Sequence, residues 1–374
     1  MTATGPGNAP GAQEAVGTTD APHGTDAVDM VDVVAIGESM VAFRPVRPGR
    51  LADVPAFDRG IGGAESNVAC VLAAAGHTTR WVGRVGADGF GDHLVEAIGA
   101  HGVDVSHVRR DPDRPTGVYF RTAGDRSTDA HEVAYYRAGS AASAMSPDGV
   151  DPAAVRAGRI LHLSGITAAL SDGCRDLMRD LTARRPGRPL VSFDVNHRPG
   201  LWRDGHGPEV LLDLARGADI VFVGDDEARE AWGLRGARAV REALPEPRLV
   251  VVKQGRDGAV ALERDPDGRP DADGTVTFVP ALHVDVVAAV GAGDAFAAGF
   301  LSATLRGLPV RDRLRHGHLT AAAALTAPGD LAPPPARALA DRLAALDDTA
   351  WGRLRLGPGW TRADEEADEE VRTP

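Results

Sequence analysis

The sequence has few cysteines, and it contains no segment that could serve as a membrane span or a signal peptide. Cys70 and Cys174 are the only cysteines in 374 residues, and both lie in apolar stretches of helical pattern, far apart in the chain. Two such residues form neither a disulfide framework nor a metal site, so we interpret them as reduced core residues. Residues 1–30 have no basic start and no apolar stretch. We therefore expect a cytoplasmic protein with no membrane partner.

Net positive charge is also lacking. The formal charge is -12 at pH 7, with a pI near 5.5. Such a chain has no electrostatic attraction to nucleic acid or to anionic lipid, so an anionic substrate would have to be received by individual arginines. Lys253 is the only lysine. A composition bias that replaces lysine with arginine explains this, and the exception is a weak indication of a role.

Short β-branched segments alternate with Ala- and Leu-rich segments of helical period. Strands are expected at 33–36, 81–85, 160–163, 190–195, 220–223 and 249–252, and helices at 65–75, 93–101, 171–183, 225–232, 294–306, 311–325 and 335–346. The alternation predicts an α/β domain over residues 31–347, with a mostly parallel central sheet and helices on both faces. Ligands collect at the carboxyl ends of the strands in such sheets. Residues 1–30 are expected to be a disordered tail, and residues 348–374 a C-terminal extension with an acidic tail.

Two segments, 41–59 and 115–137, interrupt this alternation. They are extended and aromatic, they contain Pro and Gly, and no helix separates their strand-like parts. We expect them to form a small β-sheet that acts as a lid over the site and excludes water during group transfer. Its open edge could pair with a second subunit. The alternative is an ordinary surface hairpin.

The stretch 288–300 contains the strongest candidate for a catalytic centre. Gly291, Ala292 and Gly293 precede Asp294, and apolar residues then recur with a helical period. Free N–H groups at the start of a helix form an anion site, and the two glycines would let a phosphate approach closely. The helix dipole also keeps a nearby carboxylate ionised, which suits a general base. The alternative is a tight turn followed by an ordinary helix.

A second glycine cluster, at 60–63, precedes the predicted helix at 65–75. Gly62 and Gly63 would let a small polyol lie against the backbone, and Asn67 could hydrogen-bond to it. Because glycines before a helix often form only a turn, this cluster is informative mainly together with the one at 291–293.

Three sequence motifs, in this order, resemble those of the ribokinase-like (PfkB-type) carbohydrate kinases. They are Gly-Gly-Ala-x-x-Asn at 62–67, Gly-Arg-Val-Gly-Ala-Asp-x-Phe-Gly at 83–91 and Gly-Ala-Gly-Asp-Ala-Phe at 291–296. The likeness extends from about residue 33 to about residue 346. It implies a ribokinase-like fold and a kinase that uses ATP and Mg²⁺. It also implies that Asp294 takes the proton from a sugar hydroxyl while Gly291, Ala292 and Gly293 form the anion hole.

Within this family the chain is most similar to the 2-keto-3-deoxygluconate kinases, through the blocks at 37–41, 135–141, 163–167 and 193–202. A sugar acid carries a carboxylate, which the planar fork of an arginine binds well. The expected substrate contacts are Gly63, Asn67, Tyr119, Tyr135, Arg137, Arg198 and Asp294. Arg198 would project at the binding rim after the strand at 190–195, whereas Arg137 and the tyrosines would come from the lid. Each arginine could instead be a solvated surface charge.

The resemblance places ATP along Lys253, Gly255 and Gly258, although these glycines could instead close the turn into 259–262. Glu227 matches the acidic end of the family's Asn-x-x-Glu motif and implies magnesium contact through water, but Gly224 replaces the asparagine.

A further departure lies at Ala288, where many members of the family carry an aspartate that helps to bind a monovalent cation. Alanine has no side-chain oxygen, so we expect potassium activation to be weak or absent.

The sequence thus predicts a kinase that uses ATP to phosphorylate the terminal hydroxyl of a sugar acid, in a homo-oligomer that could be a dimer joined through the lid sheet. The alternative enzyme is a fructokinase or another neutral-sugar kinase of the same family. The non-enzyme alternative is a sugar-binding regulatory protein on a kinase scaffold, which Ala288 and Gly224 favour and Asp294 opposes. A nicotinamide-dependent dehydrogenase would need Gly-x-Gly-x-x-Gly in its first strand-to-helix turn, and residues 37–40 do not provide it.

Overall fold

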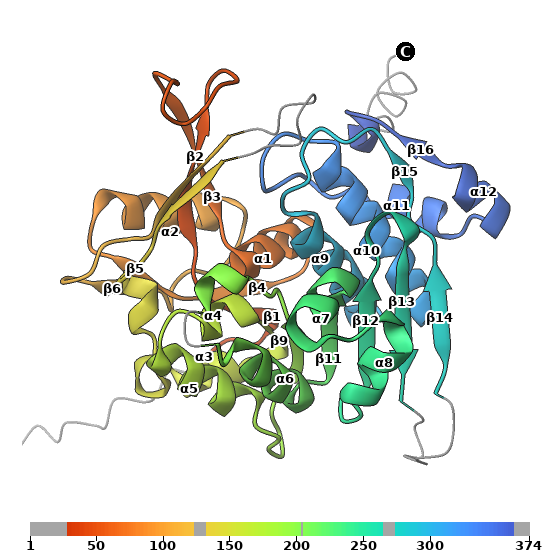
Figure 1. The fold of residues 1–374 in the computed structure, drawn as a ribbon, viewed down its shortest axis with the longest axis horizontal. Coiled ribbons are helices and arrows are strands. Elements are labelled where there is room, and N and C mark those ends of the chain that lie inside the picture. Colours follow the sequence, from red (N-terminus) through yellow and green to blue (C-terminus); the bar gives the residue numbers. More distant parts are fainter. Residues whose placement is uncertain (1–27, 123–131, 203–204, 265–273, 363–374) are drawn as a thin grey trace, which may run out of the picture.

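The computed structural model describes residues 28–122, 132–202, 205–264 and 274–362, and its centre is an eight-stranded sheet (Figure 1). The strands lie in the order β14 (Val276–Val279), β13 (Ala259–Glu263), β12 (Leu249–Lys253), β11 (Ile220–Gly224), β10 (Leu190–Asp194), β9 (Gly158–Ser164), β1 (Val31–Ile36) and β4 (Thr79–Val82). Neighbouring strands from β12 to β4 are parallel, whereas β13 and β14 are antiparallel additions at one edge. The predicted mostly parallel sheet is confirmed.

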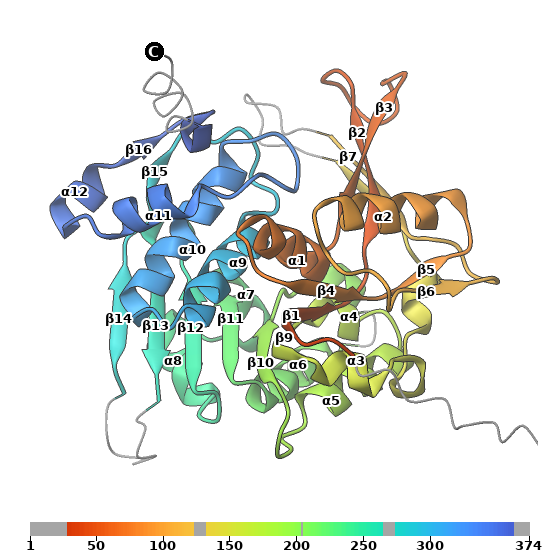
Figure 2. The same cartoon turned by 180° about the vertical axis from the view of Figure 1, so that it is seen from behind.

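Helices cover both faces of this sheet (Figures 1 and 2). One face carries α1 (Ala64–Ala74), α2 (Gly89–Ala100), α9 (Ala292–Leu305), α10 (Val310–Leu325), α11 (Arg337–Ala344) and α12 (Asp348–Arg353), and the other carries α3 (Pro152–Arg156), α4 (Gly165–Ala168), α5 (Asp172–Thr182), α6 (Gly207–Gly217), α7 (Asp225–Trp232) and α8 (Gly236–Ala243). Successive strand residues point to opposite faces. Val250 and Val252 accordingly pack in the core of the second helical layer, whereas Leu249 and Val251 pack in the core of the first.

A second sheet of four strands rises beside the main one and contains both of the segments that interrupt the α/β alternation. Its order is β3 (Phe57–Gly62), β2 (Met40–Pro45), β7 (Val118–Arg121) and β8 (Val133–Tyr136) (Figure 1). Phe43 stacks on Phe120 with ring centroids 4.8 Å apart, and Phe57 meets the same ring edge-on at 5.2 Å. These aromatic contacts hold three of the strands together. We refer to these four strands as the lid sheet; residues 123–131 of the predicted lid lie outside the described residues.

The strand predicted at 81–85 is interrupted, which corrects the sequence-based boundary. β4 ends at Val82, and β5 (Arg84–Gly86) pairs instead with β6 (Arg109–Asp111). Between them, a Cβ at Gly83 would lie 2.6 Å from the Trp81 ring and 3.0 Å from the Gly37 carbonyl oxygen. The buried Trp81 therefore packs directly against the glycine backbone where the chain leaves the main sheet.

Residues 348–362 pack onto the domain. Trp351 is fully buried, and its indole N–H donates to the Pro280 carbonyl at 2.9 Å. The strand β16 (Arg355–Leu356) pairs with β15 (His283–Val284). Single-turn helices complete the described structure: η1 (Ala141–Ala144), η2 (Pro147–Gly149), η3 (Pro199–Leu201), η4 (Gly255–Asp257) and η5 (Trp360–Arg362). The segments 1–27 and 363–374 of the predicted tails lie outside the described residues.

None of the helices in the described ranges combines the length and the apolar character that crossing a membrane requires.

Candidate active site

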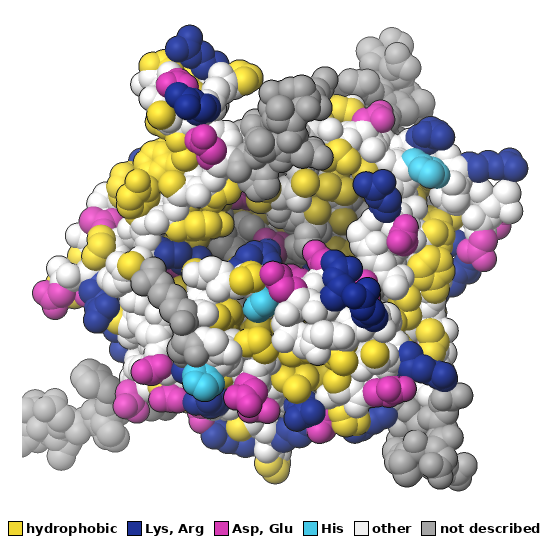
Figure 3. Space-filling view, in the orientation of Figure 1, with side chains coloured by type: hydrophobic (Ala, Val, Ile, Leu, Met, Phe, Trp, Pro, Cys, Tyr) yellow, Lys and Arg dark blue, Asp and Glu magenta, His cyan; other side chains and the backbone are white. Residues whose placement is uncertain are grey.

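A cavity of about 400 Å³ lies where the lid sheet meets the carboxyl ends of the parallel strands. In the space-filling view the surface is hollowed below the lid sheet, and basic and acidic side chains gather around the hollow (Figure 3). The predicted site residues that line the cavity are Gly63, Asn67, Tyr119, Tyr135, Arg137, Arg198, Glu227, Lys253, Gly291, Gly293 and Asp294. The fold thus brings together residues from both ends of the sequence. Ala292, Gly255 and Gly258 are not among the lining residues.

The start of α9 is built around a glycine that no other residue could replace without strain. Gly291 has φ +75°, and a Cβ there would lie 2.2 Å from the Asp330 carbonyl oxygen. It is the N-cap of α9, and the first bond of the helix runs from the Ala295 N–H to the Gly291 carbonyl at 2.9 Å. The earlier N–H groups, from Ala292 onward, have no acceptor within the helix. They provide donors for an anion at the edge of the cavity.

Asp294 lies in the first turn of α9 and is tied to α1. The Asn67 side-chain amide donates to Asp294 Oδ2 at 2.8 Å. Burial raises the pKa of Asp294 to about 7; the Asn67 hydrogen bond opposes this shift and the nearby Asp194 carboxylate adds to it. A carboxylate with a pKa near neutrality can both accept and release a proton at physiological pH, as a general base must.

Lys253 places a fixed positive charge inside the cavity. Its Nζ lies 2.9 and 3.1 Å from the two carboxylate oxygens of Asp194, at the ends of the parallel strands β12 and β10. Burial disfavours the charged amine, but the carboxylates of Asp194, Glu227 and Asp294 together outweigh this cost, and the pKa of Lys253 is raised. The ammonium also lies 3.6 Å from the position of a Cβ on Gly293. The only lysine of the chain therefore faces the glycine turn at 291–293, where the N–H groups at the start of α9 are free.

The two glycines that follow Lys253 lie elsewhere. Gly258 has φ +136°, and a Cβ there would lie 2.3 Å from the Val279 carbonyl oxygen. Its carbonyl accepts from the Gln254 N–H at 2.8 Å, which closes the turn into β13. Gly255 has φ +58° and open space around it. The geometry of Gly258 matches the turn-closing alternative, and ATP contact at either glycine stays a prediction.

On the lid side, Arg137 is held by a carboxylate that sequence reasoning did not assign to the site. Arg137 Nη2 forms an ion pair with Glu38 Oε2, and the Ser140 hydroxyl donates to Glu38 Oε1 at 2.7 Å. The side chains of Arg137 and Glu38 are 9% and 1% exposed. The guanidinium also lies over the Tyr135 ring, 5.8 Å from its centroid. Arg137 therefore lines the cavity in a fixed orientation.

A second buried carboxylate, Asp330, joins the lid sheet to the loop between α10 and α11. The Tyr119 hydroxyl donates to Asp330 Oδ2, and Arg121 Nη2 lies 2.8 Å from Asp330 Oδ1. A Cβ at Gly62 would collide with both the Tyr119 hydroxyl and the Asp330 carboxylate. The backbone of Asp330 also packs against Gly291. Asp330 thus contacts the lid sheet, the glycine cluster at 60–63 and the glycine turn at 291–293.

Arg198 lies at the rim of the cavity, with a side chain 53% exposed, and it faces Glu227. Their closest atoms, Arg198 Nη1 and Glu227 Oε1, are 3.3 Å apart. The other oxygen of Glu227 accepts from the Gly224 N–H at 2.8 Å, at the start of α7. Within the part of the chain that the structure describes, no group of three or more His, Cys, Asp or Glu residues could hold a metal ion. A single carboxylate such as Glu227 could contact a hydrated metal ion only through water.

Sequence reasoning missed Glu38, Asp194, Asn196 and Asp330, all of which line the cavity. Glu38 and Asn196 closely follow β1 and β10, and Asp194 is the last residue of β10, so the rule that ligands collect at strand ends could have found these three. Asn196 has φ +44°, a conformation that non-glycine residues adopt mainly at special positions. Asp330 lies in an irregular loop rich in Pro and Gly and carries no periodic signal.

Comparison with known proteins identifies the family of the chain. Residues 30–337 match the model of the pfkB family carbohydrate kinases. The chain is 35% identical over 310 residues to the 2-dehydro-3-deoxygluconokinase of Bacillus subtilis (strain 168), covering 80% of this chain and 91% of the relative. It is 33% identical over 289 residues to the 2-dehydro-3-deoxygluconokinase of Thermoproteus tenax, covering 76% and 85%. It also resembles a sugar kinase from Pyrococcus horikoshii in complex with ATP, with TM-score 0.70, 25% identity and coverage of 85% of this chain and 99% of that chain.

Proposed function

The chain belongs to the pfkB family of carbohydrate kinases, and we propose that it transfers the γ-phosphoryl group of ATP to the terminal hydroxyl group of a sugar acid, 2-keto-3-deoxygluconate. This sugar acid is also called 2-dehydro-3-deoxygluconate, the form of the name that appears in the names of the two similar kinases. The observation that carries the reaction type is the position of Asp294. A carboxylate whose pKa is raised to about 7 lies in the first turn of a helix with free N–H groups and close to the partly buried Lys253 ammonium.

In the proposed reaction the sugar acid lies between Gly63, Asn67 and the lid sheet, with its terminal hydroxyl directed at Asp294. Asp294 takes the hydroxyl proton as that oxygen bonds to the γ-phosphorus, the bond from the γ-phosphorus to the bridging oxygen breaks, and ADP leaves. The N–H groups at 291–293 and the Lys253 ammonium stabilise the charge on the phosphoryl oxygens. Positioning and electrostatics of this kind supply most of the acceleration in phosphoryl transfer.

Magnesium, when bound with ATP, neutralises charge on the phosphates. Glu227 is the acidic side chain that we assign to it, through water, because it lines the cavity beside the first turn of α7. Ala288 offers no side-chain oxygen for a monovalent cation, and we propose that the Lys253 ammonium provides the permanent positive charge beside the anion hole.

The substrate carboxylate is assigned to Arg137, supported by Tyr135 and Tyr119 on the lid, and to Arg198 at the rim. Arg137 lines the cavity and lies beside the ring of Tyr135, which places its guanidinium within reach of a bound sugar acid. One observation favours the neutral-sugar alternative: Arg137 and Arg198 already pair with Glu38 and Glu227. A guanidinium has five donors and can bind a second carboxylate, so these pairs also suit a role in holding the arginines ready for substrate.

A substrate panel tests the proposal. ADP release, coupled to NADH oxidation, is measured with 2-keto-3-deoxygluconate, its C4 epimer, fructose and ribose, for the wild type and for Asp294→Asn. We expect turnover of the sugar acids and a loss of at least about a thousandfold in the variant. Turnover of fructose with no activity on the acids would identify a neutral-sugar kinase. Sugar binding without turnover in the wild type would identify a regulatory binding protein.

We further assign a lid role to the four-stranded sheet and a dimer contact to its open edge, β8. The exposed side chains of this strand include Tyr135 and Tyr136, at 55% and 66%. Apolar residues on an open strand edge favour pairing with another chain. Light scattering tests the contact. We expect the wild type to be a dimer and Tyr136→Lys to be a monomer, and a monomeric wild type would refute the contact.

A further inference from the structure

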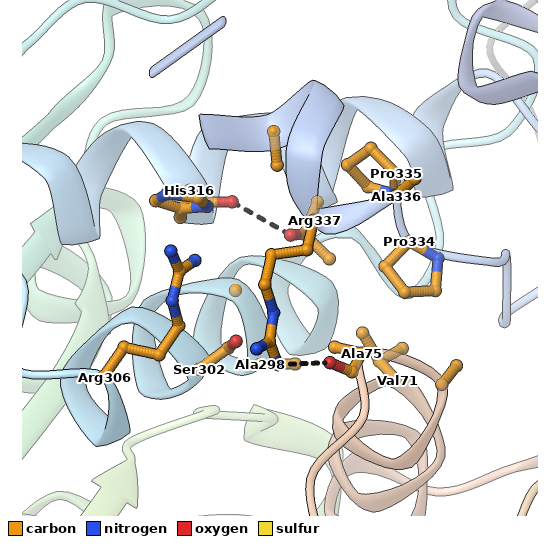
Figure 4. Close-up of a pocket in the computed structure, with 14 residues that line it drawn as sticks. Val71, Ala75, Ala298, Ser302, Arg306, His316, Pro334, Pro335, Ala336 and Arg337 are labelled. Atoms are coloured by element: carbon orange, nitrogen blue, oxygen red, sulfur yellow. Dashed lines mark hydrogen bonds between the residues drawn. The ribbon is translucent and has the colours of Figure 1, made fainter. Parts of the chain in front are cut away.

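A second cavity lies at the far ends of the two helices that begin in the active site. It measures about 110 Å³ and is enclosed by the carboxyl ends of α1 and α9, the middle of α10 and the first turn of α11 (Figure 4). Its polar lining side chains are Ser302, Arg306, His316, Thr320 and Arg337. Nothing in the proposed reaction uses these residues.

Two guanidinium groups enter this cavity from different helices. Figure 4 shows Arg306, which follows α9, and Arg337, at the start of α11, directed into the same space. Arg306 Nη2 donates to both oxygens of Asp341 at 2.7 and 2.8 Å. Arg337 Nη2 donates to the carbonyl of Ala75 at 3.2 Å, in an exposed contact. The carboxylate of Asp341 is 41% exposed and also faces His316 at 3.2 Å. These hydrogen bonds run from Nη2 of each arginine, and a guanidinium group has five donors, so both arginines can donate to a further acceptor.

The remaining groups around the cavity are two histidines, which contribute polar atoms, and the start of α11, which contributes positive potential. His77 contacts a residue of the cavity wall, because its Nε2 shares a 2.8 Å hydrogen bond with the Ser302 hydroxyl. Burial and the nearby Arg306 lower the pKa of both His77 and His316, although Asp32 and Asp341 oppose this, so both imidazoles act here as neutral hydrogen-bonding groups. The N-cap of α11 is Ala336, which has no capping side chain, so the positive end of that helix also borders the cavity.

We propose that this cavity binds a phosphate group bridged between Arg306 and Arg337, and that its occupancy regulates the active site. The planar fork of arginine matches the geometry of phosphate oxygens. A water needs about 10 to 15 Å³ of cavity volume, so a cavity of about 110 Å³ has room for one oxyanion in place of several waters. The chemical class is therefore a phosphate, either inorganic or at the end of a small ester.

The link to the active site runs along α1 and α9. At one end the helices are joined by the hydrogen bond from Asn67 to Asp294. At the other end Arg337 contacts the last turn of α1 through Ala75, and Arg306 extends from the last turn of α9. An anion held by both arginines would draw these two helical ends together. The regulatory half of this proposal rests on the proposed function, whereas the binding half does not.

The binding experiment uses the intact protein with a non-hydrolysable ATP analogue and 2-keto-3-deoxygluconate at saturation, so that the catalytic cavity is filled, including the anion hole at 291–293. Inorganic phosphate is titrated calorimetrically at constant ionic strength into the wild type, Arg337→Gln and the control Arg353→Gln. Arg353 is an exposed arginine at the end of α12, so the control removes the same charge elsewhere. We expect saturable binding to the wild type and the control, and binding at least about tenfold weaker to Arg337→Gln. No saturable binding, or equal binding to all three proteins, would overturn the site.

A second arm replaces inorganic phosphate with the phosphorylated product, and the tighter ligand identifies the source of the phosphate group. For regulation, we expect phosphate to change kcat/KM for the sugar acid at least twofold in the wild type and not in Arg337→Gln, which retains its basal kcat. Binding without any change in rate would refute the regulatory half alone. Failure of the sugar acids to react would refute the proposed function and leave the binding result standing.

Discussion

Removal of the Asn67 amide should move the pH dependence of catalysis upward, because this group stabilises the ionised form of Asp294. The pKa of about 7 predicts that kcat/KM of the wild type falls about tenfold between pH 8 and pH 6, as the base becomes protonated. Asn67 donates to Asp294 at 2.8 Å, and a hydrogen bond to a charged group contributes about 1.5 to 3 kcal/mol. Since one pKa unit corresponds to about 1.4 kcal/mol, Asn67→Ala should raise the pKa of Asp294 by about one to two units.

At pH 7 this shift lowers the ionised fraction of Asp294 from about one half to between about one tenth and one hundredth. The loss in kcat should therefore be about fivefold to fiftyfold at pH 7 and should largely disappear near pH 10. Initial rates of ADP release, recorded from pH 5.5 to 10 with ATP saturating, measure this. Asn67 also faces the proposed sugar site, so a separate rise in KM that does not depend on pH is expected.

The control for this experiment is Thr304→Ala, which changes the distant end of α9, where the hydroxyl donates to the Phe300 carbonyl at 2.8 Å. Its pH profile should match that of the wild type. A midpoint near pH 4 in the wild-type pH–rate profile would refute the prediction, since burial would then not raise the pKa of Asp294. The prediction is equally refuted if Asn67→Ala lowers kcat by the same factor at every pH.

Four further outcomes are expected. Lys253→Met should lower kcat about a hundredfold or more, because it removes the positive charge beside the anion hole and leaves Asp194 unpaired; a loss under threefold in steady-state rates would contradict this. Glu38→Gln should raise KM for the sugar acid about tenfold with little change in kcat, because it releases Arg137, and an unchanged KM would show that the pair does not hold Arg137 for substrate. Burial raises the pKa of Glu65 from 4.5 to about 8, so between these pH values the folded protein holds a proton that the unfolded chain releases, and the wild type loses stability as the pH rises. Glutamine cannot ionise, so the melting temperature of Glu65→Gln relative to that of the wild type should rise over this range. A constant difference in melting temperature would contradict the assignment. Replacing potassium with tetramethylammonium should change the rate less than twofold, because Ala288 has no side-chain oxygen, whereas a large and saturable potassium requirement would refute this.

Local sequence patterns were sufficient to predict the architecture and the helix that carries Asp294. The alternation of β-branched and helical segments is confirmed by the eight-stranded sheet with helices on both faces. The start of α9 was also predictable, because two glycines, an aspartate and an apolar helical period lie within a few residues of one another. Such features depend on backbone conformation and on side-chain period, both of which are encoded in neighbouring residues.

The pairing of charges was decided by the tertiary structure alone. Glu38 and Arg137 lie in separate strand regions, and Asp330 meets Tyr119 across 211 residues of sequence. The raised pKa of Asp294 likewise depends on its burial, and the hydrogen bond that opposes this shift comes from Asn67, which is 227 residues away. No local pattern encodes these contacts, because an ion pair or a desolvated carboxylate depends on which distant segments the packed core brings within a few ångströms. The sequence by itself determined which groups could perform the chemistry, and the packing of the two sheets determined their partners and their charge.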